Sequence, residues 1–303
     1  MSSTISPEVV RASQMGAWIR AIRPEQWLKN GFVLSPIVFS GRATIWDYQW
    51  HALMAFGAFC AVASAVYLMN DVIDREADRV HPRKASRPVA SGLISPATAM
   101  LGAGILGVGG VAIGALTGID VAIVLVAYLG LNVLYGTWLK HIVIVDVFSI
   151  AAFFVMRLLA GAFAVDVKPS IWLVLCGGLL ALYLGFAKRR HELVLLGSGS
   201  TNHRAVLADY STTFLDQLSV VLLSVTVVSY IMYTLESDTA RAVGSNAMTY
   251  STAFVLYGVL RYLYLVHRND AGNPTETLLT DRSLLATVVL WAGYCGTIIY
   301  LAR

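Results

Sequence analysis

Long apolar runs separated by short polar segments are the main pattern of this 303-residue sequence. A run of about 20 apolar residues crosses a hydrocarbon layer about 30 Å thick as an α-helix. We read nine spans, at about residues 27–40, 50–69, 96–117, 119–138, 142–165, 170–187, 214–235, 246–266 and 283–301. The first is the least regular, because Lys29 and Asn30 lie in its opening turn. The pattern predicts an all-α polytopic membrane protein, built as a bundle of nine transmembrane helices.

Composition and charge support this class. Hydrophobic residues make up 57% of the chain and charged residues 13%, against about 45–50% and about 25% in soluble domains. Most Lys and Arg residues lie in the N-terminal segment and in alternate loops, whereas the other loops hold only Arg42, Lys168, Arg241 and Arg303. By the positive-inside rule, the N-terminus and the ends of the second and sixth spans face the cytoplasm of a cell membrane.

Residues 1–26 are expected to precede the membrane domain of residues 27–303. Residues 1–10 are polar, and no short apolar core with a cleavage site follows them, so we expect no cleavable signal peptide. In residues 11–25, basic side chains alternate with apolar Met15, Trp18, Ile19 and Ile22. This pattern is typical of a helix that lies in the membrane interface.

An acidic motif follows directly after the second span. At about 100° per residue, one helix would carry its four polar members on a single face: Asn70, Asp71, Asp74 and Asp78. Carboxylates so placed repel one another unless a cation lies between them. Hard oxygen ligands without a Cys or His partner favour Mg²⁺, which completes its shell with phosphate and water. The motif therefore predicts a magnesium site at the membrane boundary.

The segment 79–92 that follows is basic and contains Lys84 and Arg87. An acidic face beside a basic loop suits a metal-bound diphosphate. The simpler interpretation is a solvated, charge-balanced loop at a helix end. Charge balance alone does not explain three aligned Asp residues at a membrane boundary, so we favour the binding site.

A second acidic group follows the sixth span. Asp209, Thr213, Asp216 and Gln217 would share one helical face. The alternative is that Asp209 or Ser211 caps the next helix and that Asp216 is paired inside the bundle. Within the fifth span, Asp146 and Arg157 are about 16 Å apart along the axis, so each needs a partner elsewhere.

Several other polar residues lie near the same membrane face. Lys29 and Asn30 either reach a phosphate across the cytoplasmic mouth or belong to an ordinary interface anchor. Tyr128, Asn132 and Tyr135 share a helix face, and they are either ligand contacts or hydrogen-bonding partners between helices.

Nine spans with acidic helix ends after the second and the sixth resemble the UbiA-type polyprenyltransferase superfamily. Its first signature is matched by Asn70-Asp71-x-x-Asp74-x-x-x-Asp78, and Arg87-Pro88 with Ser91-Gly92 also fits. The second motif departs from the usual Asp-x-x-x-Asp, because Asp216 follows Asp209 by seven residues. Together with Arg-Pro-x-Gln-Trp-x-Lys-Asn at 23–30 and Asp-Arg at 281–282, this is similar to the decaprenyl-phosphate phosphoribosyltransferase branch.

The resemblance implies an enzyme, a phosphoribosyltransferase. It would move 5-phosphoribose from phosphoribosyl diphosphate to a polyprenyl phosphate such as decaprenyl phosphate, using Mg²⁺, for the arabinan precursor of a cell wall. It assigns the catalytic role to Asp71, Asp74, Asp78 and Asp209, and the metal to Asn70, Asp71, Asp74 and Asp78. Phosphate contacts fall to Lys29, Asn30, Asn70, Lys84, Arg87 and Lys188, and ribose contacts to Tyr128, Asn132, Tyr135 and Tyr210.

Two other functions remain open at this stage. A prenyltransferase that moves a polyprenyl group to an aromatic or quinone precursor needs the same Mg²⁺ and diphosphate site. A transporter or lipid-binding protein is a different class, although transporters carry ionisable residues near mid-membrane rather than at the rim. The expected partners are the two substrates and the bilayer, with no nucleic acid. The polyprenyl length, a homo-oligomeric state and the choice between Asp209 and Asp216 also stay open.

Overall fold

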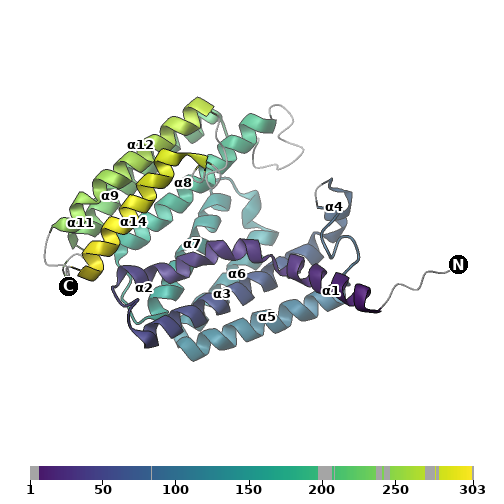
Figure 1. Cartoon of the computed structure of the whole chain (residues 1–303). Coiled ribbons are helices and arrows are strands. Elements are labelled where there is room, and N and C mark those ends of the chain that lie inside the picture. The colour runs from purple at the N-terminus through teal and green to yellow at the C-terminus, as the bar shows by residue number, and fades with distance from the viewer. Residues whose placement is uncertain are drawn as a thin grey trace.

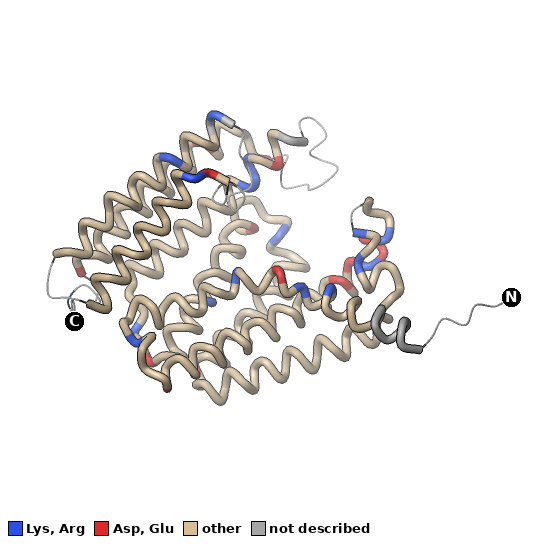
Figure 2. The backbone as a smooth tube through the Cα atoms, in the orientation of Figure 1, with Lys and Arg blue, Asp and Glu red and all other residues tan. Residues whose placement is uncertain are grey.

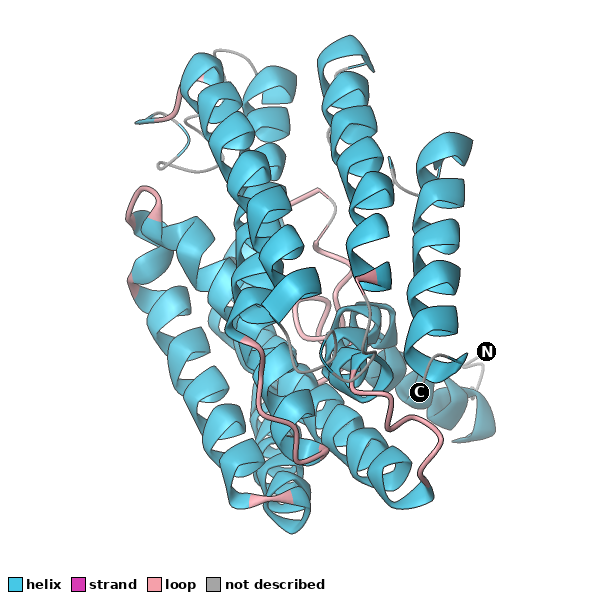
Figure 3. Cartoon of the chain, turned by 90° about the vertical axis from the view of Figure 1, so that its left-hand side faces the viewer, coloured by secondary structure: helices cyan, strands magenta, loops and turns pink. Residues whose placement is uncertain are grey.

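The computed structural model describes residues 7–82, 84–196, 207, 209–236, 241, 246–269, 277 and 280–301, and every regular element among them is helical (Figures 1 and 3). The elements are α1 (Pro7–Ile22), the 3₁₀ helix η1 (Pro24–Leu34), α2 (Ser35–Phe39), α3 (Trp46–Ile73), α4 (Arg75–Val80), α5 (Pro96–Thr117), α6 (Ile119–Thr137), the 3₁₀ turn η2 (Leu139–His141), α7 (Val145–Ala164), α8 (Ile171–Leu196), α9 (Thr212–Glu236), α11 (Ala247–Tyr250), α12 (Thr252–Asn269) and α14 (Arg282–Leu301). The predicted all-α class is confirmed.

Seven helices in the described part of the chain are long and apolar enough to cross a membrane: α3, α5, α6, α7, α8, α9 and α14. They correspond to seven of the predicted spans. α5 has the predicted bounds, 96–117, whereas α3 and α8 continue beyond their apolar runs into the charged segments that follow. The chain is therefore a multi-pass membrane protein.

The other two predicted spans are not single long α-helices. The run 27–40 forms η1 and then the short α2, because Pro36 has no N–H for the carbonyl of Phe32. The Ser35 hydroxyl donates to that carbonyl at 2.7 Å. The run 246–266 is divided at Ser251 into α11 and α12, and the Ser251 hydroxyl lies 2.6 Å from the Tyr230 hydroxyl.

Consecutive long helices pack against each other in antiparallel pairs around the bundle. The end of α3 contacts the start of α5 through Leu68 and Ala99, and the start of α6 packs on the end of α5. The ring closes where α14 returns to α2, since the Tyr300 hydroxyl donates to the Val38 carbonyl at 2.8 Å (Figure 1).

Ion pairs between neighbouring helices gather at one end of the bundle, which we call the charged end. It is formed by the ends of α3, α6, α8 and α12 and by the starts of α5, α7, α9 and α14. Figure 2 shows most of the charged residues there. Among the ion pairs of the described residues there are Arg189–Asp146 at 3.0 Å, Arg190–Asp216 at 2.6 Å and Arg261–Asp281 at 2.8 Å.

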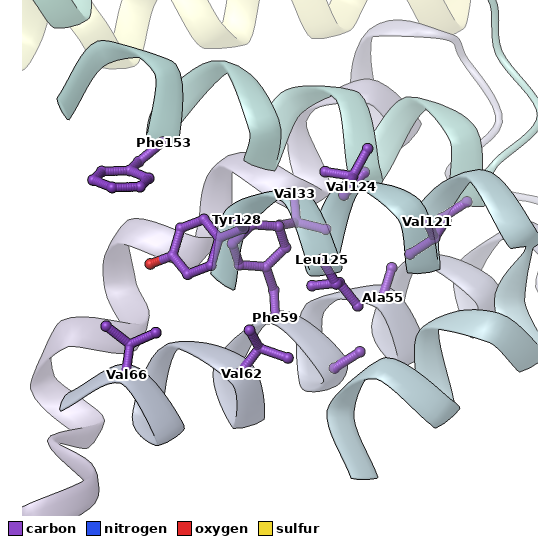
Figure 4. Close-up of a cluster of buried hydrophobic side chains, with 13 residues drawn as sticks. Val33, Ala55, Phe59, Val62, Val66, Val121, Val124, Leu125, Tyr128 and Phe153 are labelled. Carbon is purple, nitrogen blue, oxygen red and sulfur yellow. The ribbon is translucent and has the colours of Figure 1, made fainter. Parts of the chain in front are cut away.

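The largest apolar cluster lies between η1, α3, α6 and α7 (Figure 4). Tyr128 stands at its centre, with ring centroids 4.9 Å from Phe59 and 5.2 Å from Phe153 in edge-to-face geometry. Such aromatic pairs add about 0.5–1.5 kcal/mol beyond their buried area. This cluster holds α3, whose end carries the start of the acidic motif, against η1, α6 and α7.

η1 lies against both α3 and α7, and its backbone approaches α7 at Gly161. A Cβ at this position would lie 1.9 Å from the Val33 carbonyl oxygen and 2.8 Å from its carbon. On the α3 side, the Trp27 indole donates to the Ser64 hydroxyl at 3.1 Å, and that hydroxyl donates to the Ile22 carbonyl at 2.9 Å. Glycine at 161 therefore permits the close approach that holds the 24–34 segment in place.

We expect Gly161→Ala to lower the free energy of unfolding by about 3 kcal/mol, at the upper end of overpacking costs, because the obstacle is backbone rather than a movable side chain. Gly104→Ala in α5 is the matched control, since no atom lies within 4 Å of its new methyl group. Thermal unfolding of both variants in detergent measures the difference. Equal midpoints would show that η1 does not depend on this contact.

Candidate active site

The acidic motif lies on two helices rather than one. α3 ends at Ile73, and α4 begins after Asp74, whose backbone leaves the helical region at φ −87° and ψ 5°. The prediction of one continuous helix face was wrong. Like charges three and four residues apart repel, and the bend turns Asp74 to the solvent while Asp71 and Asp78 are buried.

Asp71 and Asp78 are held together by arginines. Arg87 Nη1 lies 3.2 Å from Asp71 Oδ1 and 2.6 Å from Asp78 Oδ2, and the Arg23 guanidinium donates to the same Asp71 oxygen. Lys84 Nζ stands 3.8 Å from Asp78. Both carboxylates are almost fully buried, so these cations offset charge that would otherwise be costly to remove from water. We call Asp71, Asp78, Arg23 and Arg87 the paired cluster.

Arg23 reaches this position through an uncommon backbone conformation. It has φ 53° and ψ 65°, the left-handed region, between α1 and η1. Its guanidinium also lies 4.9 Å from the centre of the Tyr67 ring. A non-glycine residue in this region costs about 1–3 kcal/mol and persists where the surroundings require it. The ion pair with Asp71 and the Tyr67 ring are such surroundings.

The donor set of the motif fits a magnesium ion. Asp71 Oδ2 is buried and accepts no hydrogen bond in the described structure, so a carboxylate oxygen remains for a hard cation. Asn70 Oδ1 points toward the end of α6, 3.9 Å from where a Cβ on Gly136 would stand. Within the described residues, however, no three His, Cys, Asp or Glu side chains are grouped closely enough to hold a metal by themselves. Arg87 Nη1 occupies the place between the two carboxylates.

An open pocket of about 320 Å³ adjoins the paired cluster. It lies between the start of η1 and the segment after α4, and its lining residues are Arg20, Arg23, Glu25, Gln26, Ser86, Arg87 and Pro88. Three arginines and one carboxylate line it, and two of the arginines, Arg23 and Arg87, also pair with Asp71 and Asp78. Arginine matches phosphate with paired donors, so the pocket suits a phosphate or diphosphate group.

A second buried charge network joins α7, α8 and the segment before α9. Asp146 is fully buried, and it accepts from Arg189 Nε at 3.0 Å and from the Tyr210 hydroxyl at 3.3 Å. Burial, and to a smaller extent the Asp146 carboxylate, raise the pKa of Tyr210 to about 12. The hydroxyl is therefore neutral at physiological pH and remains a donor to Asp146.

Tyr210 also holds the start of α7. Its oxygen accepts from the Ile144 N–H at 2.6 Å. Ile144 has φ 70° and ψ −48°, and the Val145 N–H donates to the Val143 carbonyl at 2.8 Å, which defines a γ-turn with positive φ. This turn is strained, and more so for a β-branched residue. The strain is localised beside Asp146.

The second acidic motif does not form one helical face. α9 begins at Thr212, so Asp209 precedes the helix and is exposed. The Ser211 hydroxyl accepts from the Phe214 N–H at 3.2 Å, as a capping residue does. Asp216 pairs with Arg190 at 2.6 Å. The structure therefore shows the alternative, in which Ser211 caps α9 and Asp216 is paired. The participation of Asp209 or Asp216 in metal binding stays a prediction.

The remaining predicted residues lie in and around the aromatic cluster. Asn30 is buried, donates to Cys60 Sγ at 3.3 Å and accepts from Arg157 Nε at 2.8 Å. Asn132 donates to the Tyr128 carbonyl at 2.7 Å. Tyr135 packs edge-on against Phe153, with 5.9 Å between ring centroids. Lys29 and Lys188 are exposed, and the two ammonium groups are close enough to influence each other.

Sequence reasoning did not assign Arg23 or Arg189 to a site. Arg23 was part of the 23–30 motif, but nothing in the sequence indicated that it pairs with Asp71, 48 residues away. The expectation that Asp146 and Arg157 find separate partners is confirmed. The sequence did offer one signal, since polar groups inside membrane spans usually face the bundle interior. It could not identify their partners, because these come from other helices.

The fold and the site together define a multi-pass helical membrane protein with an arginine-lined pocket beside buried carboxylates at one end of its bundle. Residues 32–287 match the UbiA prenyltransferase family. The chain belongs to this family and is a transferase, as the sequence motifs predicted. A solved UbiA homolog from Archaeoglobus fulgidus, bound to DMAPP and Mg²⁺, has the same fold: the TM-score is 0.70 over 93% of this chain and 98% of that chain, at 18% identity.

Curated relatives resemble the chain over almost its whole length. It is 32% identical over 292 residues to the decaprenyl-phosphate phosphoribosyltransferase of Mycolicibacterium smegmatis, covering 93% of this chain and 92% of the relative. The protein of that name from Corynebacterium glutamicum is 30% identical over 281 residues, covering 90% and 83%. The predicted resemblance to this branch is confirmed.

We expect Asp146→Asn to lower the free energy of unfolding by about 3 kcal/mol, because it removes the fully buried counter-charge of Arg189 and leaves that guanidinium with only the partly exposed Glu192, at 2.9 Å. Asp47→Asn is the matched control, since that side chain is 79% exposed and its His51 partner is 3.8 Å away; an exposed pair contributes about 0–1 kcal/mol. Thermal unfolding in detergent compares the two. If both variants melt alike, Asp146 does not anchor the charged end.

Proposed function

We propose that this chain transfers 5-phosphoribose from phosphoribosyl diphosphate to a polyprenyl phosphate, with decaprenyl phosphate as the acceptor, and releases diphosphate. The observation that carries the proposal is the similarity of nearly the whole chain to proteins named decaprenyl-phosphate phosphoribosyltransferase, at 30–32% identity. The site supports it, because the arginine-lined pocket beside buried carboxylates suits a donor with several phosphate groups. The product would serve the synthesis of a cell-wall arabinan.

We assign the donor diphosphate to the acidic motif and the basic segment after it. Asn70, Asp71, Asp74 and Asp78 would hold Mg²⁺, with Asp71 Oδ2 as the buried oxygen that is not yet engaged. When bound, the ion neutralises charge on the departing diphosphate. Arg23, Lys84 and Arg87 would contribute further positive charge to the same group. Tyr128, Asn132, Tyr135 and Tyr210 are the candidates for ribose contacts, and Asp209 for assistance from the second motif.

The proposed reaction needs no dedicated base. The bond between C1 of ribose and the diphosphate oxygen breaks, and the diphosphate leaves with the electron pair. A lipid phosphate oxygen, already ionised at neutral pH, forms the new bond to C1. The protein holds the two anions side by side and stabilises the leaving group, which is electrostatic catalysis by groups placed in advance.

We propose that the charged end faces the cytoplasm and that nine segments cross the plasma membrane, two of them as η1 with α2 and α11 with α12. The excess of Lys and Arg at this end supports the orientation. Residues 1–26, with Met15 and Ile19 of α1 exposed, would lie along the inner surface of the membrane. Residues 27–303 would form the membrane domain, from which the lipid tail passes between helices into the bilayer.

Prenyl transfer to an aromatic acceptor is the second candidate. It is favoured by the solved neighbours, which are described with the prenyl diphosphates DMAPP and GPP bound with Mg²⁺. Membership of a transferase family speaks against a transporter.

Purified protein in lipid vesicles, given radiolabelled phosphoribosyl diphosphate, decaprenyl phosphate and Mg²⁺, is expected to yield a labelled lipid. No label is expected after removal of Mg²⁺ with EDTA. Turnover of a polyprenyl diphosphate with 4-hydroxybenzoate, without any labelled lipid, would instead establish the second candidate.

Asp74→Asn is expected to lower kcat/KM by about 10²–10³-fold, the usual cost of removing one group that stabilises a transition-state charge. Because Asp74 is exposed, the unfolding temperature of the variant should equal that of the unchanged protein. Glu76→Gln, two residues away and with a side chain 75% exposed, is the matched control and should keep full activity. Equal activity in both variants would contradict the assignment of Asp74 to the metal.

A further inference from the structure

One arginine of the pocket beside the paired cluster has no counter-charge in the described part of the chain. The pocket, of about 320 Å³, is lined by Arg20, Arg23 and Arg87 among others. Arg23 and Arg87 are paired with Asp71 and Asp78. Within the described residues, no ion pair or hydrogen bond engages the Arg20 side chain. Its guanidinium, which has five N–H donors, is therefore available to an anion in the pocket.

α1 carries Arg20 to this position as a packed helix. Ala17 and Ala21, on the same helix, are fully buried in one apolar cluster with Leu68 of α3, and Trp18 packs against that cluster. An arginine in an interfacial helix usually extends to lipid head groups. Here the side chain lines a pocket that is shared with η1 and the segment after α4. Its place is therefore set by tertiary packing.

Glu25, from η1, is the carboxylate of the same pocket, and its side chain is exposed. It too takes part in no ion pair or hydrogen bond among the residues that the structure describes. A site for a bare anion gains nothing from a carboxylate, because like charges repel. A carboxylate does accept hydrogen bonds from hydroxyl groups, and Gln26 and Ser86 add neutral donors to the lining. The pocket thus offers a cation for a phosphate and an acceptor for hydroxyls, which are the two kinds of group in a sugar phosphate.

The pocket and the paired cluster have two residues in common. Arg23 and Arg87 line the pocket and also hold Asp71 and Asp78. A ligand that fills the pocket therefore reaches the groups that we assign to Mg²⁺ and the donor diphosphate. A molecule with a phosphate at one end and a diphosphate at the other can engage both places, whereas a prenyl diphosphate has neither the second phosphate nor the hydroxyls.

We propose that Arg20 binds the 5-phosphate of the donor and that Glu25 accepts hydrogen bonds from its ribose hydroxyls. The ligand class is a pentose 5-phosphate whose C1 carries a diphosphate directed to the paired cluster. The inference rests on the proposed function and deepens it, because it names the residues that distinguish a phosphoribosyl donor from a prenyl diphosphate. Glu25 adds to the ribose contacts already proposed, and Arg20 acts on binding of the donor rather than on departure of the diphosphate.

The two ends of the donor should differ in their dependence on metal. Arg20 needs no rearrangement to bind a phosphate, whereas Arg87 Nη1 stands between Asp71 and Asp78 until a cation takes its place. Ribose 5-phosphate is therefore expected to raise the unfolding temperature of the full chain in detergent even with EDTA, and inorganic diphosphate is expected to do so only with Mg²⁺. A Mg²⁺ requirement for ribose 5-phosphate, or equal stabilisation by inorganic phosphate, would overturn the proposal.

Arg20 and Glu25 are both exposed, so substitutions there leave the fold intact. Arg20→Gln is expected to abolish stabilisation by ribose 5-phosphate and to leave stabilisation by diphosphate with Mg²⁺ unchanged. Glu25→Ala is expected to reduce the effect of ribose 5-phosphate to that of inorganic phosphate, because only the contact with hydroxyls is lost. Arg268→Gln is the matched control, since it removes another exposed arginine at the charged end, near the end of α12 and outside the pocket. The proposal fails if Arg20→Gln responds to ribose 5-phosphate as the control does.

Steady-state kinetics in lipid vesicles separate failure of this inference from failure of the proposed function. Arg20→Gln is expected to raise KM for phosphoribosyl diphosphate by about 10–100-fold, the effect of losing a hydrogen bond between charged groups, and to leave KM for decaprenyl phosphate unchanged. If labelled lipid forms and the donor KM of Arg20→Gln is unchanged, the reaction stands and the assignment of Arg20 fails. If ribose 5-phosphate binds through Arg20 but no labelled lipid forms, the sugar-phosphate site stands and the proposed reaction fails.

Discussion

The pairing of buried charges at one end of an apolar bundle is the constraint on which the structure depends. Asp71, Asp78 and Asp146 are almost completely withdrawn from solvent, and each is stabilised by an arginine. The arginines of Asp71 and Asp146, Arg23 and Arg189, come from distant parts of the chain. A carboxylate in such surroundings is tolerated only when it is paired and hydrogen-bonded. These contacts therefore determine how the ends of α3, α7 and α8 are positioned, while the apolar faces determine only that the helices pack.

The two charge networks have different consequences for function. Both carboxylate oxygens of Asp146 accept hydrogen bonds, from Arg189 and from the Tyr210 hydroxyl. The Tyr210 oxygen also accepts from the Ile144 N–H and so secures the strained turn there. This network holds the framework. Around Asp71, the second carboxylate oxygen is left without a partner, and the adjoining pocket is lined by arginines. An incomplete network of this kind is suited to be completed by a metal ion and a phosphorylated ligand.

Much of the fold was predictable from the sequence, because seven apolar runs are long enough to require helices whatever their neighbours are. The runs at 27–40 and 246–266 were wrongly predicted as single helices, because each is divided, near Pro36 and at Ser251. Hydropathy reports how apolar a segment is, not where the backbone hydrogen bonds of a helix are interrupted. The acidic motif was also recognised. Its geometry was not, because helical periodicity ignores repulsion between like charges, and the bend at Asp74 relieves it.

By itself the sequence determined that the chain crosses a membrane, that its acidic motif lies at the end of a span, and that it resembles a family of transferases; each of these follows from local composition and spacing. Only the tertiary structure decided which charges meet. The pairing of Arg23 with Asp71, the approach of Val33 to Gly161 and the proximity of Arg157 to Asn30 join residues between 48 and 128 positions apart. Such contacts depend on how whole helices pack, and no local pattern records them.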